Sequence, residues 1–278
     1  MRRISRITSN VLTYLILIIV SFLVLFPIYW IVTMSFKIRI DIITLPPKWI
    51  PYRITLSNYQ WILSFTGFLR ALKNSAIVSA VSTLLALCVG VPAGYSFSRF
   101  KFKGRDSLYF WIITTRMTPP IGIIIPFYMI WIHLGLLDTY ASLIITYLVI
   151  NLPLVIWLMK GFFDEIPSSL EEAAMVDGCS PLSAFLRVAL PLAIPGLMAT
   201  AIMSFVMIWN EFFFALILTV RNAQTAPVVV ATMVTHGLEF KWGELAAAGV
   251  ICMLPAMVFT VIAQKYLVRG LTMGAIRG

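Results

Sequence analysis

Charged residues are scarce in this sequence. Only 12% of its 278 residues are Asp, Glu, Lys or Arg, whereas 60% are hydrophobic, and the mean hydropathy is +0.96. Soluble domains are closer to half apolar and a quarter charged. So few polar groups cannot cover so much apolar surface in water. The composition therefore excludes a soluble globular protein and predicts one whose solvent is lipid.

Clusters of metal ligands and nucleotide-binding motifs are also lacking. Cys88, Cys179 and Cys252 are widely spaced with no CxxC pair, and His133 and His236 each stand alone. Metal sites need several ligands close together, so neither a metal nor a redox site is expected. No GxxxxGK[ST] run occurs either. This chain is therefore not expected to hold nucleotide phosphates by that device.

The excess of basic residues does not indicate a nucleic-acid partner. The net charge is +10, but the Lys and Arg residues lie mostly at the ends of apolar runs. That placement is typical of residues that set membrane topology and contact anionic lipid headgroups. No basic groove with interleaved aromatic residues is visible. Membrane lipid is the expected partner of these charges.

Long apolar runs dominate the sequence. A spanning helix needs roughly 20 apolar residues, and only helices satisfy their backbone groups within one such segment. The sequence therefore predicts an all-α membrane protein with about six spans, at 11–36, 74–98, 108–132, 139–159, 188–220 and 245–264. The first run is too long for a signal peptide and is taken as a span. Without an internal repeat, a single domain over 1–278 is expected.

The distribution of Lys and Arg sets the expected orientation. With the N-terminus in the cytosol, 12 of these residues lie on the cytosolic side, 8 lie outside, and Arg116 lies within a span. The bias predicts a multi-pass protein of the cell membrane with cytosolic N- and C-termini and a cytosolic loop over 160–187. The outer segment from Lys37 to Lys73 is long, and its three prolines predict ordered, extended structure.

The cytosolic loop carries the most patterned stretch of the sequence. Ser168 with Glu171, or Ser169 with Glu172, predicts a capping box that begins a helix. Gly178 predicts a left-handed turn that ends this helix. The next residues, Ser180 and Pro181, are typical of an N-cap and first helical position, so a second helix is expected. The loop is thus predicted to form either a projection that fits a cleft on another protein or an ordinary capped helix lying on the membrane surface.

The same stretch resembles a known family motif. Glu172-Ala-Ala-x-x-Asp177-Gly178, followed by Phe185, Val188 and Leu190-Pro191, is similar to the EAA coupling motif of ABC importer permeases. Cys179 departs from the alanine usual there. The similarity covers almost the whole chain and is to the carbohydrate type, the maltose- and glycerol-phosphate-like permeases. Its further matches are Ser35–Lys37, Pro47–Pro51, Leu56–Tyr59, Asn74-Ser75, Trp209–Phe212, Trp242–Glu244 and Gly270–Gly278.

The resemblance implies a function and a set of partners. It implies a type I importer permease fold that forms half of a pathway for a sugar or sugar-like solute, coupled to a separate ATPase through the helix at 168–178. ATP and Mg would be bound by the ATPase dimer. A second, related but non-identical permease and an extracytoplasmic solute-binding protein are implied too. The residues expected to couple to the ATPase are Glu171, Glu172, Ala173, Ala174, Asp177, Gly178, Leu190 and Pro191.

Two charged residues lie within predicted spans. Arg116 precedes Pro119 and Pro120, which predict a kinked or broken helix. It is either a gate or pathway residue, or it pairs with an acid or extends its side chain to the inner interface. Glu211 follows Trp209 and Asn210, a trio suited to a solute pathway because indole rings stack on sugars and the polar groups bond hydroxyls.

The alternative for Trp209, Asn210 and Glu211 is a polar cluster that packs helices together, with Arg221 or Lys241 as the partner of Glu211. A self-sufficient channel or secondary transporter is the alternative class of protein. It would show ionisable relays within the spans and an internal repeat. A membrane-embedded enzyme would need a nucleophile with a base, or a metal set. The substrate itself, whether sugar, polyol or glycerol-phosphate ester, is left open.

Overall fold

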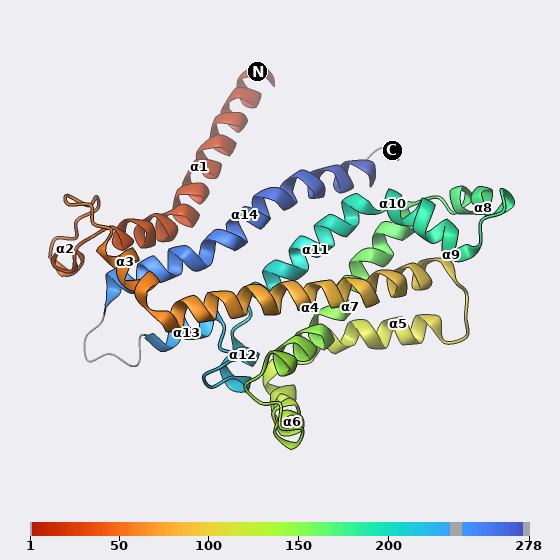
Figure 1. Ribbon diagram of the computed structural model, residues 1–278. Helices are drawn as coiled ribbons and strands as arrows, with labels where there is room; N and C mark the ends of the chain where they lie inside the picture. Colours follow the sequence, from red (N-terminus) through yellow and green to blue (C-terminus); the bar gives the residue numbers. More distant parts are fainter. Residues whose placement is uncertain (1, 234–240, 275–278) are drawn as a thin grey trace. The chain divides into compact units, whose positions relative to one another are not determined.

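The computed structural model describes residues 2–233 and 241–274, and side chains for residues 10–233, 241–262 and 264 (Figure 1). Every regular element within these residues is a helix, which confirms the predicted all-α fold. The described residues divide into two compact units, one drawn from 1–69 and 230–253 and the other from 70–229 and 254–278. The single domain expected over the whole chain stays a prediction.

The first unit is built around the end of a long helix and the segment that follows it. It contains α1 (Arg2–Ser35), α2 (Arg39–Ile43), α3 (Ser57–Ser64) and the start of α14 (Trp242–Gly274). The Asn58 amide donates to the carbonyl oxygens of Ser35 and Lys37, at 2.9 Å each. Lys48 pairs with Asp41. These bonds order the proline-containing segment on either side of α2.

Lys37 is the most deeply buried charge of this unit, at 1% exposure. Its ammonium lies 4.4 Å from the ring centroid of Trp30 and donates to the carbonyl oxygen of Lys48. Burial lowers the pKa of Lys37, while the Asp41 carboxylate acts in the opposite direction and is the smaller effect. The lysine therefore ties the C-terminal end of α1 to the segment after α2.

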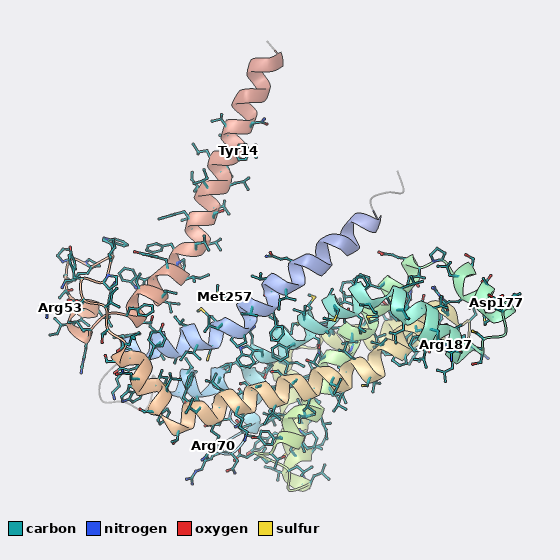
Figure 2. The ribbon with its side chains drawn as sticks, turned by 45° about the horizontal axis from the view of Figure 1, so that its top comes forward. Tyr14, Arg53, Arg70, Asp177, Arg187 and Met257 are labelled. Atoms are coloured by element: carbon teal, nitrogen blue, oxygen red, sulfur yellow. The ribbon has the colours of Figure 1, made fainter. Side chains whose placement is uncertain are left out.

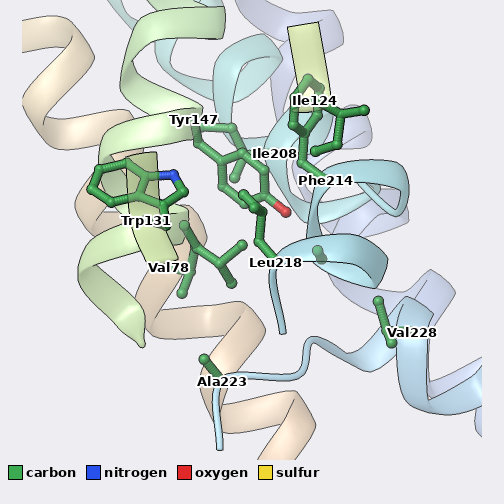
Figure 3. Packing of buried hydrophobic residues seen from close by; sticks show 11 residues of the cluster. Val78, Ile124, Trp131, Tyr147, Ile208, Phe214, Leu218, Ala223 and Val228 are labelled. Carbon is green, nitrogen blue, oxygen red and sulfur yellow. The ribbon is translucent and has the colours of Figure 1, made fainter. Parts of the chain in front are cut away.

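The second unit holds most of the remaining helices. In chain order these are α4 (Thr66–Arg99, from residue 70), α5 (Arg105–Thr114), η1 (Thr115–Met117), α6 (Pro120–His133), α7 (Tyr140–Glu165), α8 (Ser169–Val176), α9 (Pro181–Ala184), η2 (Phe185–Ala189), α10 (Leu190–Leu192), α11 (Ile194–Trp209), α12 (Phe213–Leu218) and the first half of α13 (Ala226–Met233, to residue 229). The central helix α7 packs against α11, α5 and α12. Figure 3 shows a core cluster at this centre, including Trp131, Tyr147 and Phe214.

Within the described residues, four helices are long and apolar enough to cross a membrane, and two bent helix pairs bring the number of spans to as many as six. The four are Asn10–Ser35, Thr66–Arg99, Tyr140–Glu165 and Trp242–Ile262. They correspond to the first, second, fourth and sixth predicted spans, with some ends shifted by several residues. The predicted number of about six is therefore compatible with the structure.

The third and fifth predicted spans, 108–132 and 188–220, correspond to bent helix pairs rather than to continuous helices. Arg105–Met117 and Pro120–His133 meet at 96°, and Pro181–Leu192 and Ile194–Trp209 meet at 74°. Proline lacks an N–H donor and clashes with the preceding turn. The break expected at Pro119 and Pro120 is confirmed. Pro191 and Pro195 flank the second break, and another separates α11 from α12.

Two glycines let α4 and α7 approach closely. Gly90 and Gly94 lie one turn apart on α4, the small-xxx-small arrangement of packed membrane helices. A Cβ atom at Gly94 would lie 3.0 Å from the backbone nitrogen of Lys160 and 3.1 Å from the carbonyl oxygen of Ile156. One at Gly90 would lie 2.6 Å from a Val155 methyl carbon. The two backbones are therefore in near contact toward the C-terminal ends of both helices.

Replacing Gly94 with alanine should loosen this helix pair. The added methyl group meets backbone atoms that cannot rotate away, and such overpacking costs about 1–3 kcal/mol. We expect the thermal midpoint of the detergent-solubilised protein to fall by about 5 °C. Gly161→Ala on α7 is the matched control, because nothing lies within 4 Å of its added Cβ atom. Equal melting of the two variants would contradict the close packing.

Candidate functional site

The segment after α7 forms the helix, turn and helix that the sequence predicts. Helix α8 ends at Val176, and Gly178 adopts φ +93°, in the left-handed region predicted for it. The N–H of Cys179 donates to the carbonyl oxygen of Ala174 at 3.0 Å, closing the turn. The Ser180 hydroxyl then accepts from the Ser183 N–H, and α9 begins at Pro181. Figure 2 shows the labelled Asp177 at the outer end of this segment.

The predicted capping box is wrong. Ser168 occupies the N-cap position of α8, but its side chain makes no capping bond. The Glu171 side chain turns away from the helix start and is buried, with the residue 4% exposed. Its carboxylate accepts from the Tyr95 hydroxyl at 2.5 Å and from Arg99 Nε at 2.7 Å. A buried carboxylate is attracted more strongly to the full positive charge of Arg99 than to a neutral backbone N–H, so the ion pair prevails.

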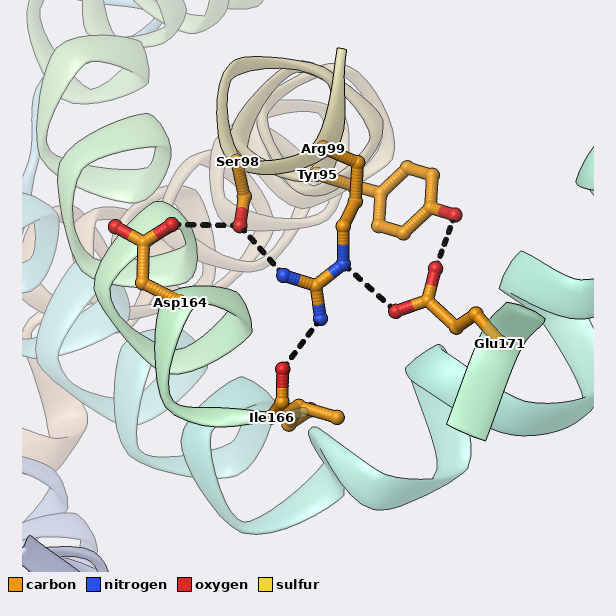
Figure 4. A network of polar contacts seen from close by, with 6 residues as sticks. All are labelled: Tyr95, Ser98, Arg99, Asp164, Ile166 and Glu171. Carbon is orange, nitrogen blue, oxygen red and sulfur yellow. Dashed lines mark hydrogen bonds and ion pairs between the residues drawn. The ribbon is translucent and has the colours of Figure 1, made fainter. Parts of the chain in front are cut away.

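Arg99 connects several elements at once (Figure 4). Besides Glu171, its guanidinium donates to the carbonyl oxygen of Ile166 at 2.8 Å and to the Ser98 hydroxyl at 3.1 Å. Ser98 in turn donates to Asp164 at 2.6 Å, and Asp164 also pairs with Lys160 at 2.5 Å. The network therefore joins the end of α4, the end of α7 and the buried side of α8.

The opposite side of the segment is open. Glu172, Ala173, Asp177 and Gly178 are all exposed. Apolar side chains lie among them: Leu170 is 46% exposed, Met175 40%, Val176 87% and Leu182 67%. We call these eight residues the α8–α9 face. Exposed apolar side chains bordered by charges mark protein interaction surfaces.

The predicted coupling residues thus fall into two groups. Glu172, Ala173, Asp177 and Gly178 belong to the α8–α9 face, and Pro191 is exposed on α10. Glu171 is buried in the network, Ala174 is half-buried, and Leu190 packs against the cluster that contains Tyr95, Phe163 and Phe185. The sequence did not separate these groups, because the partner that draws Glu171 inward, Arg99, lies on a distant helix.

The residues predicted for the solute pathway do not form one cluster. Trp209 is buried at the end of α11 and stacks on Phe205, with ring centroids 5.9 Å apart. Asn210 is exposed, and its amide donates to the carbonyl oxygen of Val206 at 2.8 Å. Arg116 is exposed in η1, with a guanidinium nitrogen 4.0 Å from the Met207 sulfur. Their pathway roles stay predictions.

Glu211 has a partner that the sequence did not reveal. Its carboxylate accepts from the buried Tyr147 hydroxyl at 2.6 Å, rather than pairing with Arg221. It also accepts from the N–H groups of Phe214 and Ala215, at 2.9 and 3.2 Å. Glu211 therefore caps the start of α12 and ties it to α7. Carboxylates are stabilised by free N–H groups at helix N-termini.

Asp138 is a functional-site candidate that sequence reasoning missed. It adopts φ 59° between α6 and α7, and its carboxylate accepts from the N–H groups of four consecutive residues, Val220 to Ala223, at 2.9–3.2 Å. Burial alone raises the pKa of Asp138, but these backbone N–H donors outweigh it and lower the pKa below its ordinary 3.8. The local sequence gave only one indication of this turn: Asp138 follows shortly after Gly135, and both residue types tolerate left-handed backbone conformations.

Asn74 reinforces the same loop. Its amide donates to the carbonyl oxygens of Asn222 and Gln224 at 2.9 and 2.8 Å, and its oxygen accepts from Tyr140 at 2.6 Å. The Ser75 hydroxyl accepts from the Ala226 N–H at 2.8 Å. The connection between α12 and α13 is thus held by side chains from α4 and from the start of α7.

Asp138→Asn should release this loop. The amide offers one acceptor in place of a carboxylate, and hydrogen bonds to charged groups contribute about 1.5–3 kcal/mol. Hydrogen-exchange protection of residues 220–223 should fall by roughly tenfold or more at pH 7. Because the folded pKa is lowered, the wild-type protection is present above pH 3.8 and is lost as the pH falls through the lowered value.

The variant should lack that acid transition. Asp106→Asn is the control, since the Asp106 side chain is 89% exposed and pairs with Arg105 at the surface. Wild-type protection that persists unchanged in Asp138→Asn would show that the carboxylate does not hold the loop.

The chain consists of membrane helices and exposes an apolar and acidic segment that suits another protein. These features are typical of the membrane subunit of a multi-subunit transporter. Comparison with known proteins identifies the particular family. The family model for binding-protein-dependent transport system inner membrane components matches residues 86–273, and the chain belongs to this family. This confirms the resemblance noted in the sequence.

Relatives agree along nearly the full length. A probable ABC transporter permease protein, y4oR of Sinorhizobium fredii, is 38% identical over 98% of each chain. The trehalose/maltose transport system permease protein MalG of Thermococcus litoralis is 35% identical over 99% of each chain. A chain from the crystal structure of a bacterial ABC transporter involved in the import of the acidic polysaccharide alginate aligns with a TM-score of 0.79 and 26% identity, covering 94% of this chain and 97% of that one.

The protein is therefore a multi-pass membrane permease subunit of an ATP-driven importer. The predicted fold class and general function are confirmed.

Proposed function

We propose that this chain forms half of the translocation pathway for a sugar or sugar-like solute and receives the energy of ATP hydrolysis through the helix at 168–178. ATP and Mg are bound by a separate ATPase dimer. A second, related but non-identical permease completes the pathway, and an extracytoplasmic solute-binding protein delivers the solute. The N- and C-termini lie in the cytosol.

The α8–α9 face is the observation that carries this proposal. Val176 and Leu182, at 87% and 67% exposure, would be costly to leave in water on a stable surface. Their neighbours Glu172 and Asp177 are acidic on a side of the protein where Lys and Arg outnumber Asp and Glu. An apolar centre with a charged rim fits a groove on a partner protein better than it fits a lipid surface.

The substrate class is supported by the relatives and by the residues near the helix breaks. One relative is named for trehalose and maltose transport, and the alginate importer acts on a polysaccharide. Asn210 is exposed at the break after α11, and Arg116 is exposed at the break before α6. Hydrogen-bonding side chains at broken helices are the kind of groups that contact polar solutes in membranes.

Reconstitution tests the proposal directly. The chain is expressed with the candidate ATPase, second permease and solute-binding protein, and the complex is purified through a tag on this chain. An ATPase should co-purify, and ATP-dependent uptake into proteoliposomes should require the binding protein and favour di- or oligosaccharides over amino acids. Uptake without any ATPase would instead support a self-sufficient transporter.

The proposed orientation predicts opposite labelling of two exposed positions. In a background with the three native cysteines replaced by serine, Trp49→Cys should react with a membrane-impermeant maleimide in intact spheroplasts. Val176→Cys, in cells that express this chain without the ATPase, should react only after permeabilisation. Trp49 is 57% exposed and Val176 87% exposed, so access is not limited by folding. Labelling of Val176→Cys from outside would overturn the orientation.

A further inference from the structure

One buried ion pair attaches α8 to the rest of the second unit. The side chain of Glu171 is 5% exposed and that of Arg99 13% exposed, and they meet at 2.7 Å. Glu171 lies on α8 and Arg99 is the last residue of α4, so the pair joins elements far apart in sequence. Removing one partner of a buried pair leaves an uncompensated charge, which is far more damaging than losing a surface pair.

The guanidinium of Arg99 donates hydrogen bonds to three acceptors at once. Its Nε, Nη2 and Nη1 groups donate to Glu171, to the Ile166 carbonyl oxygen and to Ser98. Ile166 is the C-cap of α7, directly before the short connection to α8. A lysine could not reproduce this planar arrangement of donors. Arg99 therefore sets the position of α8 against both the helix that precedes it and α4.

The surroundings of the pair are rigid. The Tyr95 ring, one turn before Arg99, packs on Phe163 of α7 and Phe185 of η2, with centroids 5.3 and 4.5 Å apart. Close packing at Gly90 and Gly94 holds α4 against α7. Helix α8 by itself has eight residues and follows a short connection, so it would otherwise turn about that connection. The pair removes this freedom.

We propose that Arg99 is a positioning residue for energy coupling, and that Glu171 serves as its anchor rather than as a contact for the ATPase. When the ATPase moves the α8–α9 face, the Arg99–Glu171 pair passes this motion to α4 and α7 as one body. The proposal rests on the proposed function of α8 as the coupling helix. It assigns Glu172 to the partner surface and its neighbour Glu171 to the interior.

Neutralising the two residues singly and together tests the proposal. In Arg99→Gln the Glu171 carboxylate is left buried without its cation. The ATPase should still co-purify, because the α8–α9 face is intact. Solute transported per ATP hydrolysed should fall roughly tenfold, the usual scale of a coupling free energy between two sites. The double variant Arg99→Gln with Glu171→Gln should recover part of this loss, because no unpaired buried charge remains.

A distance measurement separates positioning from general stability. Spin labels at Val176 and Trp157 report α8 against α7, since both side chains are exposed, at 87% and 53%. The distance distribution should broaden in Arg99→Gln and narrow again in the double variant. Arg105→Gln is the control, because Arg105 pairs with Asp106 at the surface. It should leave both the transport per ATP and the distance unchanged.

Wild-type transport per ATP and an unchanged distance in Arg99→Gln would overturn the proposal. If Arg99→Gln does not assemble, Arg99→Lys and the double variant are judged by the same two measurements. If the wild-type chain binds no ATPase, the proposed function fails instead. The label distances still show in that case whether Arg99 positions α8, so the two failures are distinguishable.

Discussion

Gly178→Asp should nearly abolish transport while leaving the membrane bundle intact. Gly178 has φ +93°, and a side chain in that backbone conformation costs about 1 kcal/mol or more. Nothing lies within 4 Å of an added Cβ atom, so the substitution causes no clash within the chain. The bulk and charge of aspartate would instead meet the partner surface. Gly178→Ala, which adds strain with little bulk, should lose transport only several-fold.

Gly104→Asp is the matched control for this prediction. Gly104 has φ +83° at the start of α5 and equally open surroundings, so the strain of the two variants is alike. It lies outside the α8–α9 face and should transport almost normally. The measurements are uptake, ATPase stimulation by the binding protein and co-purification of the ATPase. Full transport by Gly178→Asp with normal ATPase binding would show that this turn is not part of the coupling element.

Glu211→Ala should act mainly on assembly. The substitution removes the cap of α12 and leaves the Tyr147 hydroxyl, on a residue 2% exposed, without its acceptor. Each unsatisfied buried group costs about 1–3 kcal/mol, so several degrees of thermal stability and much of the complex yield should be lost. Glu211→Gln keeps an acceptor for Tyr147 and should be milder.

Asn210→Ala separates the pathway role from the packing role. Asn210 is exposed, and its amide bonds only within its own helix region, to the Val206 carbonyl oxygen. Yield and stability should therefore stay near the wild-type level, while uptake falls or substrate preference changes. Normal uptake by Asn210→Ala would remove this residue from the pathway. Normal yield of Glu211→Ala would show that Glu211 is not needed as a cap.

The C-terminal ends of α4 and α7 are held to one another, and α8 is held to both of them. Close helix packing at Gly94 and the Arg99–Glu171 pair both limit relative movement of these elements. Packed interfaces transmit displacement because they resist continuous deformation. Loosening either contact should therefore reduce coupling and lower the thermal midpoint. Arg99→Gln should in addition broaden the distribution of distances between α8 and α7.

Features set by neighbouring residues could be predicted from the sequence. Apolar runs of about 20 residues are long enough to cross a bilayer whatever surrounds them, so the all-α fold and most spans followed from composition. The turn at Gly178 and the helix start at Ser180 and Pro181 depend on local backbone preferences. The helix break at Pro119 also depends on local backbone preferences, because a proline disrupts the helical turn in which it lies.

Features set by distant residues required the tertiary structure. Glu171 has the sequence context of a capping residue, yet Arg99 of another helix draws its carboxylate inward. Glu211 bonds Tyr147, 64 positions away, and Asp138 holds a loop more than 80 positions away. A charged side chain pairs with the strongest partner that folding brings within reach. The sequence pattern does not show which distant residues these will be. The sequence by itself thus determined the helices and their turns, whereas the tertiary structure decided which acids face a partner and which hold the bundle together.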